Sequence, residues 1–148
     1  MTDTERPGAG RDRIRTATRS KARKRALDIL FESELRGSAA LDTLAERTAD
    51  ADPPVRDFTT DLVRGVVDHQ SEIDARIVAS LSPRWTLARM PRVDRNVLRI
   101  AVYEIDYADI PDAVAVAEAV ALVGDLSTDD SPAFVNGVLG SITATKVA

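Results

Sequence analysis

The spacing of apolar residues constrains the fold of this chain more than any other feature, because they recur every three or four positions along most of its length. Between residues 92 and 109, Val93, Val97 and Ile100 share one side of a helix, and Leu98 widens that side. The sequence has no run of alternating apolar and polar residues and no Asn-Gly hairpin between such runs. This pattern predicts an all-α protein, a compact bundle of six or seven helices.

Prolines, glycines and helix-capping residues divide the pattern into segments. Ser20 is placed to cap the first helix and Gly37 to end it, and Pro53 and Pro54 precede the third. The first expected helices cover 21–36, the segment from Ser38 to before Asp52, and the segment from Pro54 through Val66. The residues Ile73, Ile77 and Leu81 belong either to a continuation of the third helix or to a separate helix. The remaining helices are expected over 92–109, over 112–126 and after the cap formed by Ser131-Pro132. We expect 92–109 to be central because its apolar surface is wide.

Positive charge is concentrated at the start of a chain that is acidic elsewhere. Residues 1–25 hold nine basic and three acidic side chains, a net charge of +6, whereas residues 26–148 carry a net charge of −10. A basic segment on an acidic body steers a polyanion to one place, so nucleic acid is the expected ligand. Residues 1–18 contain one large apolar side chain, Ile14, and are expected to form a disordered basic tail, with the folded domain over 19–148.

Side chains that enzymes and metal sites commonly use are scarce. The sequence has no cysteine, and its single histidine, His69, has no nucleophile in its sequence context. It contains neither a P-loop nor a G-x-G-x-x-G motif after a strand. We interpret Asp125, Asp129 and Asp130 as a solvated turn before a helix rather than a magnesium site. The sequence therefore predicts a protein that is not an enzyme and holds no cofactor or metal.

The sequence also lacks the marks of export or membrane insertion. No apolar run approaches the roughly 20 residues that a membrane-spanning helix needs. The basic N-terminus is not followed by the apolar stretch of a secretory signal. With no cysteine, the composition suits a reducing compartment, and we expect a cytoplasmic protein.

Four segments, in this order, resemble the NusB family of transcription antitermination factors. They are Arg23-Lys24-Arg25-Ala26 leading to Leu30-Phe31, the segment 62–66, the segment 93–104, and the segment 130–139 with its Phe-Val-Asn-Gly-Val-Leu run. The resemblance covers roughly residues 20–143. It implies a non-catalytic, all-helical RNA-binding domain made of two small helical bundles.

The resemblance further implies a function, partners and site residues. Such factors bind the boxA element of nascent ribosomal RNA operon transcripts as single-stranded RNA, together with the small-subunit ribosomal protein NusE, and join other Nus factors on the elongating polymerase. By position, the implied RNA contacts are Arg19, Lys21, Arg23, Lys24, Arg25, Phe31, Asp130, Phe134 and Asn136. The implied partner contacts are an exposed Asp94, with Arg95 and Arg99. Phe31 and Phe134 also fit apolar stripes and so fit a core, and Asp130 fits either a base amine or a weakening of RNA affinity.

Two alternatives stay open at the level of sequence. Some RNA cytosine methyltransferases carry a similar domain, which suggests an accessory, non-catalytic subunit for ribosomal RNA modification. The chain has no cysteine nucleophile and ends where such a catalytic domain would begin, which favours the stand-alone factor. The small residues Gly137, Gly140 and Ala144 suggest a homodimer seam, although packing within the chain is the favoured interpretation.

Overall fold

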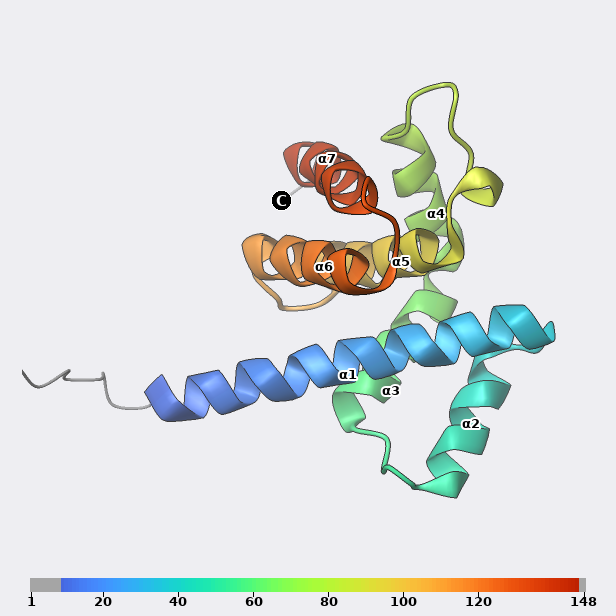
Figure 1. Cartoon of the computed structure of the whole chain (residues 1–148), viewed down its shortest axis with the longest axis vertical. Helices are drawn as coiled ribbons and strands as arrows, with labels where there is room; N and C mark the ends of the chain where they lie inside the picture. Colours follow the sequence, from blue (N-terminus) through green and yellow to red (C-terminus); the bar gives the residue numbers. More distant parts are fainter. Residues whose placement is uncertain (1–8, 147–148) are drawn as a thin grey trace, which may run out of the picture.

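The structure is a computed structural model, and it describes residues 9–146. Within these residues the chain forms seven α-helices, one 3₁₀ turn and no strand, which confirms the all-α prediction (Figure 1). The helices are α1 (Ala9–Arg36), α2 (Ala40–Asp50), α3 (Asp57–Asp68), α4 (Gln70–Ala79), α5 (Arg92–Tyr107), α6 (Asp112–Leu126) and α7 (Ser131–Ala144), and the 3₁₀ turn η1 covers Leu87–Arg89.

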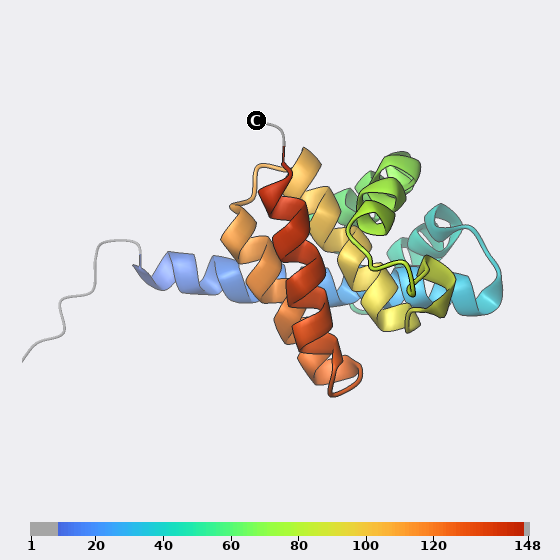
Figure 2. The ribbon, with the colours of Figure 1, turned by 90° about the horizontal axis from the view of Figure 1, so that it is seen from above.

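The helices form two groups along the long first helix. In Figure 1, α2 lies below α1, α3 begins below α1 and passes behind it, and α5, α6 and α7 lie above it. Seen from above, α5, α6 and α7 run side by side and cross α1 (Figure 2). α4 follows α3 directly and returns the chain to the upper group. This arrangement agrees with the two small helical bundles that the resemblance implies.

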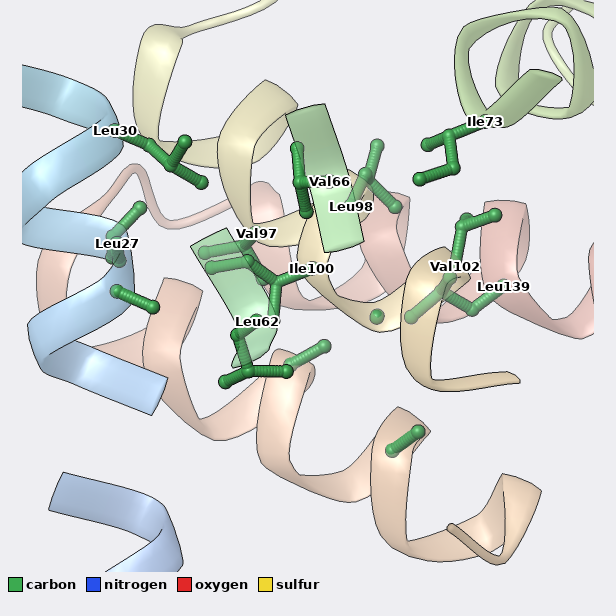
Figure 3. Packing of buried hydrophobic residues seen from close by; sticks show 14 of the residues in the cluster. Leu27, Leu30, Leu62, Val66, Ile73, Val97, Leu98, Ile100, Val102 and Leu139 are labelled. Carbon is green, nitrogen blue, oxygen red and sulfur yellow. The ribbon is translucent and has the colours of Figure 1, made fainter. Parts of the chain in front are cut away.

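One apolar core joins the two groups, and α5 lies at its centre. Val97, Leu98, Ile100 and other apolar side chains of α5 are buried. Figure 3 shows them among Leu27 and Leu30 of α1, Leu62 and Val66 of α3, Ile73 of α4 and Leu139 of α7. Burying one such side chain stabilises the fold by about 1.5–3 kcal/mol. The expectation of a central helix over 92–109 is confirmed. Among the described elements, α1, α3, α4, α6 and α7 all pack against α5.

The first helix begins earlier than the sequence predicts. The structure places residues 9–18 in α1, so the expected helix start after Ser20 is wrong; residues 1–8 of the expected tail lie outside the described residues. Ala22, Arg23 and Ala26 are buried and anchor the helix. Once an anchored turn exists, each further residue extends the helix without a new nucleation cost, and the Arg and Ala residues before Ser20 favour helix.

Candidate nucleic-acid interface

The basic residues expected to bind RNA do not lie on one surface. Arg23 is buried, with only 2% of its surface exposed, and its Nε and Nη2 donate to Oε1 and Oε2 of Glu104 on α5, each at 2.8 Å. Its Nη1 lies 3.8 Å from Glu118 on α6, which also accepts a hydrogen bond from Ser20. The expectation that Arg23 contacts phosphate is therefore corrected, because its guanidinium forms a buried ion pair with Glu104.

The other cations of this segment remain at the surface of α1. Lys21 and Lys24 are exposed, and Arg25 is half-buried with an Nε that has no hydrogen-bond partner in the described chain. Lys24 lies 3.5 Å from Asp28, and both side chains are 54% exposed. Such a surface pair is worth little, so Lys24 can exchange its carboxylate for a phosphate at small cost.

Phe31 lies on the same side of α1 as Lys24, because seven residues make two helical turns. It is half-buried, and it is not among the partly buried residues that pack against the core of the described chain. The interpretation of Phe31 as a core residue is therefore wrong. An aromatic ring beside a lysine, free of the core, offers a surface on which an unpaired base can stack.

Asp94 has a structural role rather than the expected exposed position. It is 2% exposed, and its Oδ1 and Oδ2 accept hydrogen bonds from Ser127 (2.6 Å) and Ser131 (2.9 Å). These bonds fasten the turn between α6 and α7 to the first turn of α5. The expectation that Asp94 faces a partner is corrected, because both carboxylate oxygens are already engaged inside the protein.

Arg95 and Arg99 point to the other side of α5 and join it to α1. Arg95 Nη2 donates to Glu34 at 2.8 Å, and Arg99 Nη1 donates to the other oxygen of Glu34 at 3.1 Å. Arg99 also holds Asp74 of α4 at 2.8 Å. Burial alone would raise the pKa of Glu34, but the hydrogen bond and charge of Arg95, with help from Asn96 and Arg99, hold that pKa below its ordinary value. A cavity of about 630 Å³ opens beside this cluster.

The start of α7 carries the second group of expected RNA contacts. Asp130 is exposed at the N-cap position, so it takes the place that the sequence analysis gave to Ser131. Phe134 packs partly against the core and lies 5.5 Å from the ring of Trp85, measured between ring centroids. Asn136 faces elsewhere: it is exposed and borders a groove with Val116, Val120 and other residues between α6 and α7.

Sequence reasoning missed Trp85. Its side chain is 45% exposed and lies against Phe134. A large aromatic side chain in a polar turn after Ser82-Pro83 is the signal that could have marked it. Together Trp85 and Phe134 present an aromatic pair next to Asp130.

The first turn of α5 contacts both elements that carry the expected RNA residues, α1 and the start of α7. Asp94 binds the start of α7, and its neighbour Arg95 binds Glu34, which lies one turn beyond Phe31 on α1. In Figure 1 the start of α5, the end of α6 and the start of α7 lie above the second half of α1. We give the name aromatic-basic face to two groups of residues: Lys21, Lys24, Arg25 and Phe31 on α1, and Trp85, Asp130 and Phe134 around the start of α7.

The small residues of α7 lie at the surface, contrary to the favoured interpretation. A Cβ atom added at Gly137 or Gly140 would meet no heavy atom within 4 Å in the described structure. Packing within the chain therefore does not explain them. Gly140 instead borders the groove between α6 and α7.

Residues 9–146 contain neither a metal-binding cluster nor a membrane-spanning helix. No group of three or more His, Cys, Asp or Glu side chains is placed to hold a metal ion there, so Asp125, Asp129 and Asp130 do not form one. None of the helices in this part of the chain is both long and apolar enough to cross a membrane.

The distinctive features of the described residues are surfaces and buried ion pairs on an all-α fold. The model of the NusB family matches residues 20–144, and the chain belongs to this family of transcription antitermination proteins. It is 59% identical over 131 residues to the antitermination protein NusB of Nocardioides sp. (88% of this chain, 96% of the relative). It is 54% identical to NusB of Acidothermus cellulolyticus, over 86% of this chain and 88% of the relative.

Solved structures show the same fold. NusB of T. maritima has a TM-score of 0.78 and 31% identity, covering 88% of this chain and 93% of its own. The antitermination factor NusB crystallised with NusE and double-stranded RNA has a TM-score of 0.74 and 28% identity, covering 85% of this chain and 96% of that one. The predicted family and its non-catalytic character are thus confirmed.

Proposed function

We propose that this protein is an RNA-binding antitermination factor that binds boxA RNA of nascent ribosomal RNA operon transcripts together with the ribosomal protein NusE. The observation that carries the proposal is the likeness to a NusB that was crystallised with NusE and RNA. The pair then joins the other Nus factors on the elongating polymerase, which places the protein in the cytoplasm.

The aromatic-basic face is the proposed RNA surface. Lys21, Lys24 and Arg25 supply exposed or half-exposed cations for phosphates, and Phe31 supplies a ring for a base. Trp85 and Phe134, whose ring centroids lie 5.5 Å apart, form the second part of the proposed surface, with Asp130 at the N-cap of the helix that carries Phe134. Phosphate contacts position a strand, and stacking with base-edge contacts selects its sequence, so the face combines both kinds of contact.

NusE is the proposed partner of the acidic body. Residues 26–148 carry a net charge of −10, which complements a basic ribosomal protein and speeds its association. Arg95 and Arg99, the partner contacts that the resemblance implies, border the cavity beside Glu34, and this cavity is the proposed docking position; its lining holds three arginines and one carboxylate, so the charge of the acidic body does not select it. Asp94 supports the position from within, because it fixes the turn that carries Asp130.

Fluorescence anisotropy with a labelled boxA RNA tests the proposal. The titration is run over a series of salt concentrations, with and without NusE, and with single-stranded and duplex forms of the same RNA. We expect NusE to tighten binding, and we expect affinity to fall steeply with salt because phosphate contacts release counterions. Binding that is insensitive to salt, or that NusE does not improve, would contradict the proposal.

Lys24→Gln is the variant that tests the RNA surface in the same assay. Removing one phosphate contact should lower the salt slope by roughly 0.7 for a single strand. Arg64→Gln is the matched control, because Arg64 is an exposed cation on α3 that borders a different cavity, with Thr48 and Asp68. If the salt dependence of RNA affinity is equal for the two variants, Lys24 does not contact the RNA.

A further inference from the structure

A pocket between α1 and the start of α3 gathers arginines from two distant parts of the sequence. Arg15 and Arg19 reach it from the N-terminal half of α1, and Arg56 reaches it from the residue that caps α3. Phe58 forms part of its wall, and Asp57 is an acidic residue in its lining. The cavity volume is about 560 Å³, which lies in the range of pockets that hold small ligands.

The positive charge of this pocket is not neutralised by ion pairs. Among the described residues, no carboxylate oxygen is recorded within 4.0 Å of the guanidinium nitrogens of Arg15, Arg19 or Arg56. Arginines elsewhere do have such partners: Arg76 lies 2.9 Å from Asp106 and Arg99 lies 2.8 Å from Asp74. Burial, followed by repulsion from Arg15 and Arg23, lowers the pKa of Arg19, although Glu104 opposes this shift. An anion in the pocket relieves that repulsion.

One of the arginines is already held in place. The guanidinium carbon of Arg19 lies 5.0 Å from the centroid of the Phe58 ring, a distance that a cation–π interaction requires. Phe58 is itself half-buried and packs against the core, so it does not move freely. Because Arg19 is ordered before any ligand arrives, binding an anion there costs less side-chain entropy than binding to a free surface arginine.

The ion pair with Glu104 compensates the charge of Arg23 but not the charges of the arginines in the pocket. Arg23 also lies over the Phe58 ring, with its guanidinium carbon 5.3 Å from the centroid, but its charge is compensated by Glu104. The charge left uncompensated on this side of α1 is therefore that of Arg15 and Arg19, one turn apart, together with Arg56 opposite them. Guanidinium groups suit phosphate because their planar N–H donors match its oxygens.

We propose that the pocket of Arg15, Arg19 and Arg56 binds a backbone phosphate of the RNA strand, so that the RNA path continues from α1 onto the start of α3. The inference rests on the proposed function and adds to it a contact outside the expected RNA residues, at Arg56 on a different element. Phe58 serves as the positioning residue that orients Arg19.

Arg56→Gln and Arg15→Gln in the full chain test the inference, each against the Arg64→Gln control. All are measured by anisotropy with a boxA RNA that carries several extra nucleotides on both sides, over a salt series. Each pocket variant should weaken binding by about threefold to tenfold, and because the pocket holds one phosphate, the double variant should lower the salt slope by roughly 0.7 in total. Arg64→Gln should change neither quantity.

The outcomes separate the two proposals. If the unmodified protein binds RNA and both pocket variants titrate like Arg64→Gln, the phosphate site is overturned and RNA binding stands. If the unmodified protein binds no RNA, the proposed function fails and the inference fails with it. Arg15 and Arg56 are both exposed, so their removal should leave the unfolding transition unchanged, and Arg15→Gln decides the matter if Arg56→Gln does not fold.

Discussion

At the scale of single residues, Arg23 and Lys24 show how neighbours in one basic segment take opposite roles. Arg23 points into the protein and shares two hydrogen bonds with Glu104, whereas Lys24 points outward. Burying an ion pair costs much desolvation free energy, which the mutual attraction and good hydrogen bonds offset. Removing one partner leaves the other charge buried and uncompensated, and this is the costly case.

We therefore predict that Glu104→Leu lowers the free energy of unfolding by about 3–5 kcal/mol. The double variant Arg23→Met with Glu104→Leu should be far less destabilised, because both charges leave the interior together. Urea unfolding followed by circular dichroism measures both. A single variant as stable as the unmodified protein would show that the pair does not hold α1 against α5.

The sequence shows that these positions are charged, but it does not show whether each side chain faces the core or the solvent. Arg23 and Glu104 are separated by 81 positions, and no local pattern in the sequence links them. Asp94 is similar. It stands at the start of a helix, where an exposed acidic residue is common, but in the fold it is buried and accepts hydrogen bonds from two serines at the turn between α6 and α7. Phe31 fits an apolar stripe, and only the folded chain shows that the core does not reach it.

At the scale of elements, the crossing of α3 and α5 depends on Gly65. A Cβ atom at Gly65 would overlap the ring of Tyr103 on α5, so the two helices approach closely only because position 65 has no side chain. The Tyr103 ring also stacks near Tyr107 at a centroid distance of 6.2 Å, and Tyr107 stacks on His69 at 3.9 Å. These rings cover the junction between α3 and α4.

We predict that Gly65→Ala destabilises the protein by about 1–3 kcal/mol, since the added methyl group forces the Tyr103 ring or the helix to move. Gly124→Ala is the matched control, because a Cβ there meets Pro132 Cγ at an ordinary 3.7 Å. At that helical site alanine should be neutral or stabilising by up to about 1 kcal/mol. Thermal unfolding compares the two, and equal effects would contradict this account of the crossing.

The Glu34 cluster connects α1, α4 and α5, and its stability should depend on pH. The pKa of Glu34 lies below its ordinary value of 4.5, so its ionised form stabilises the folded state above that pH. This contribution is lost as the pH falls through the lowered folded-state pKa. The difference in unfolding free energy between the unmodified protein and Glu34→Gln should thus be constant near neutral pH and shrink below pH 4.5. A difference that grows on acidification would contradict the assignment.

Helix positions were easier to predict than helix ends. The expected helix over 112–126 has the same bounds as α6, because Pro111 and the Ala-Val spacing both mark it. The sequence allows either a continuation or a separate helix around Ile73 and Ile77, and α4 is a separate helix. The sequence does not indicate the start of α1, because an arginine-rich stretch with one large apolar residue is typical of a tail, while the helix there depends on anchoring residues further along the chain.

At the scale of the whole molecule, the aromatic-basic face and the groove between α6 and α7 are separate surfaces. The groove is lined by Val116, Ala117, Val120 and Gly140, with Asn136 at its edge. The homodimer suggested by Gly137, Gly140 and Ala144 stays a prediction. If the groove is the seam, Ala117→Glu should lower the molar mass that light scattering records at high concentration. A constant monomer mass for the unmodified protein would dismiss the homodimer.

The direct test of the whole account is photo-crosslinking of the complex with boxA RNA and NusE, followed by mass spectrometry of the attached peptides. The account predicts RNA on the peptides of α1 that contain Lys21 to Phe31, on the turn that contains Trp85 and on the start of α7. The peptide that contains Arg56 should join them. RNA found only on α2 or near Lys146 would contradict the account, because those segments lie outside both the aromatic-basic face and the arginine pocket.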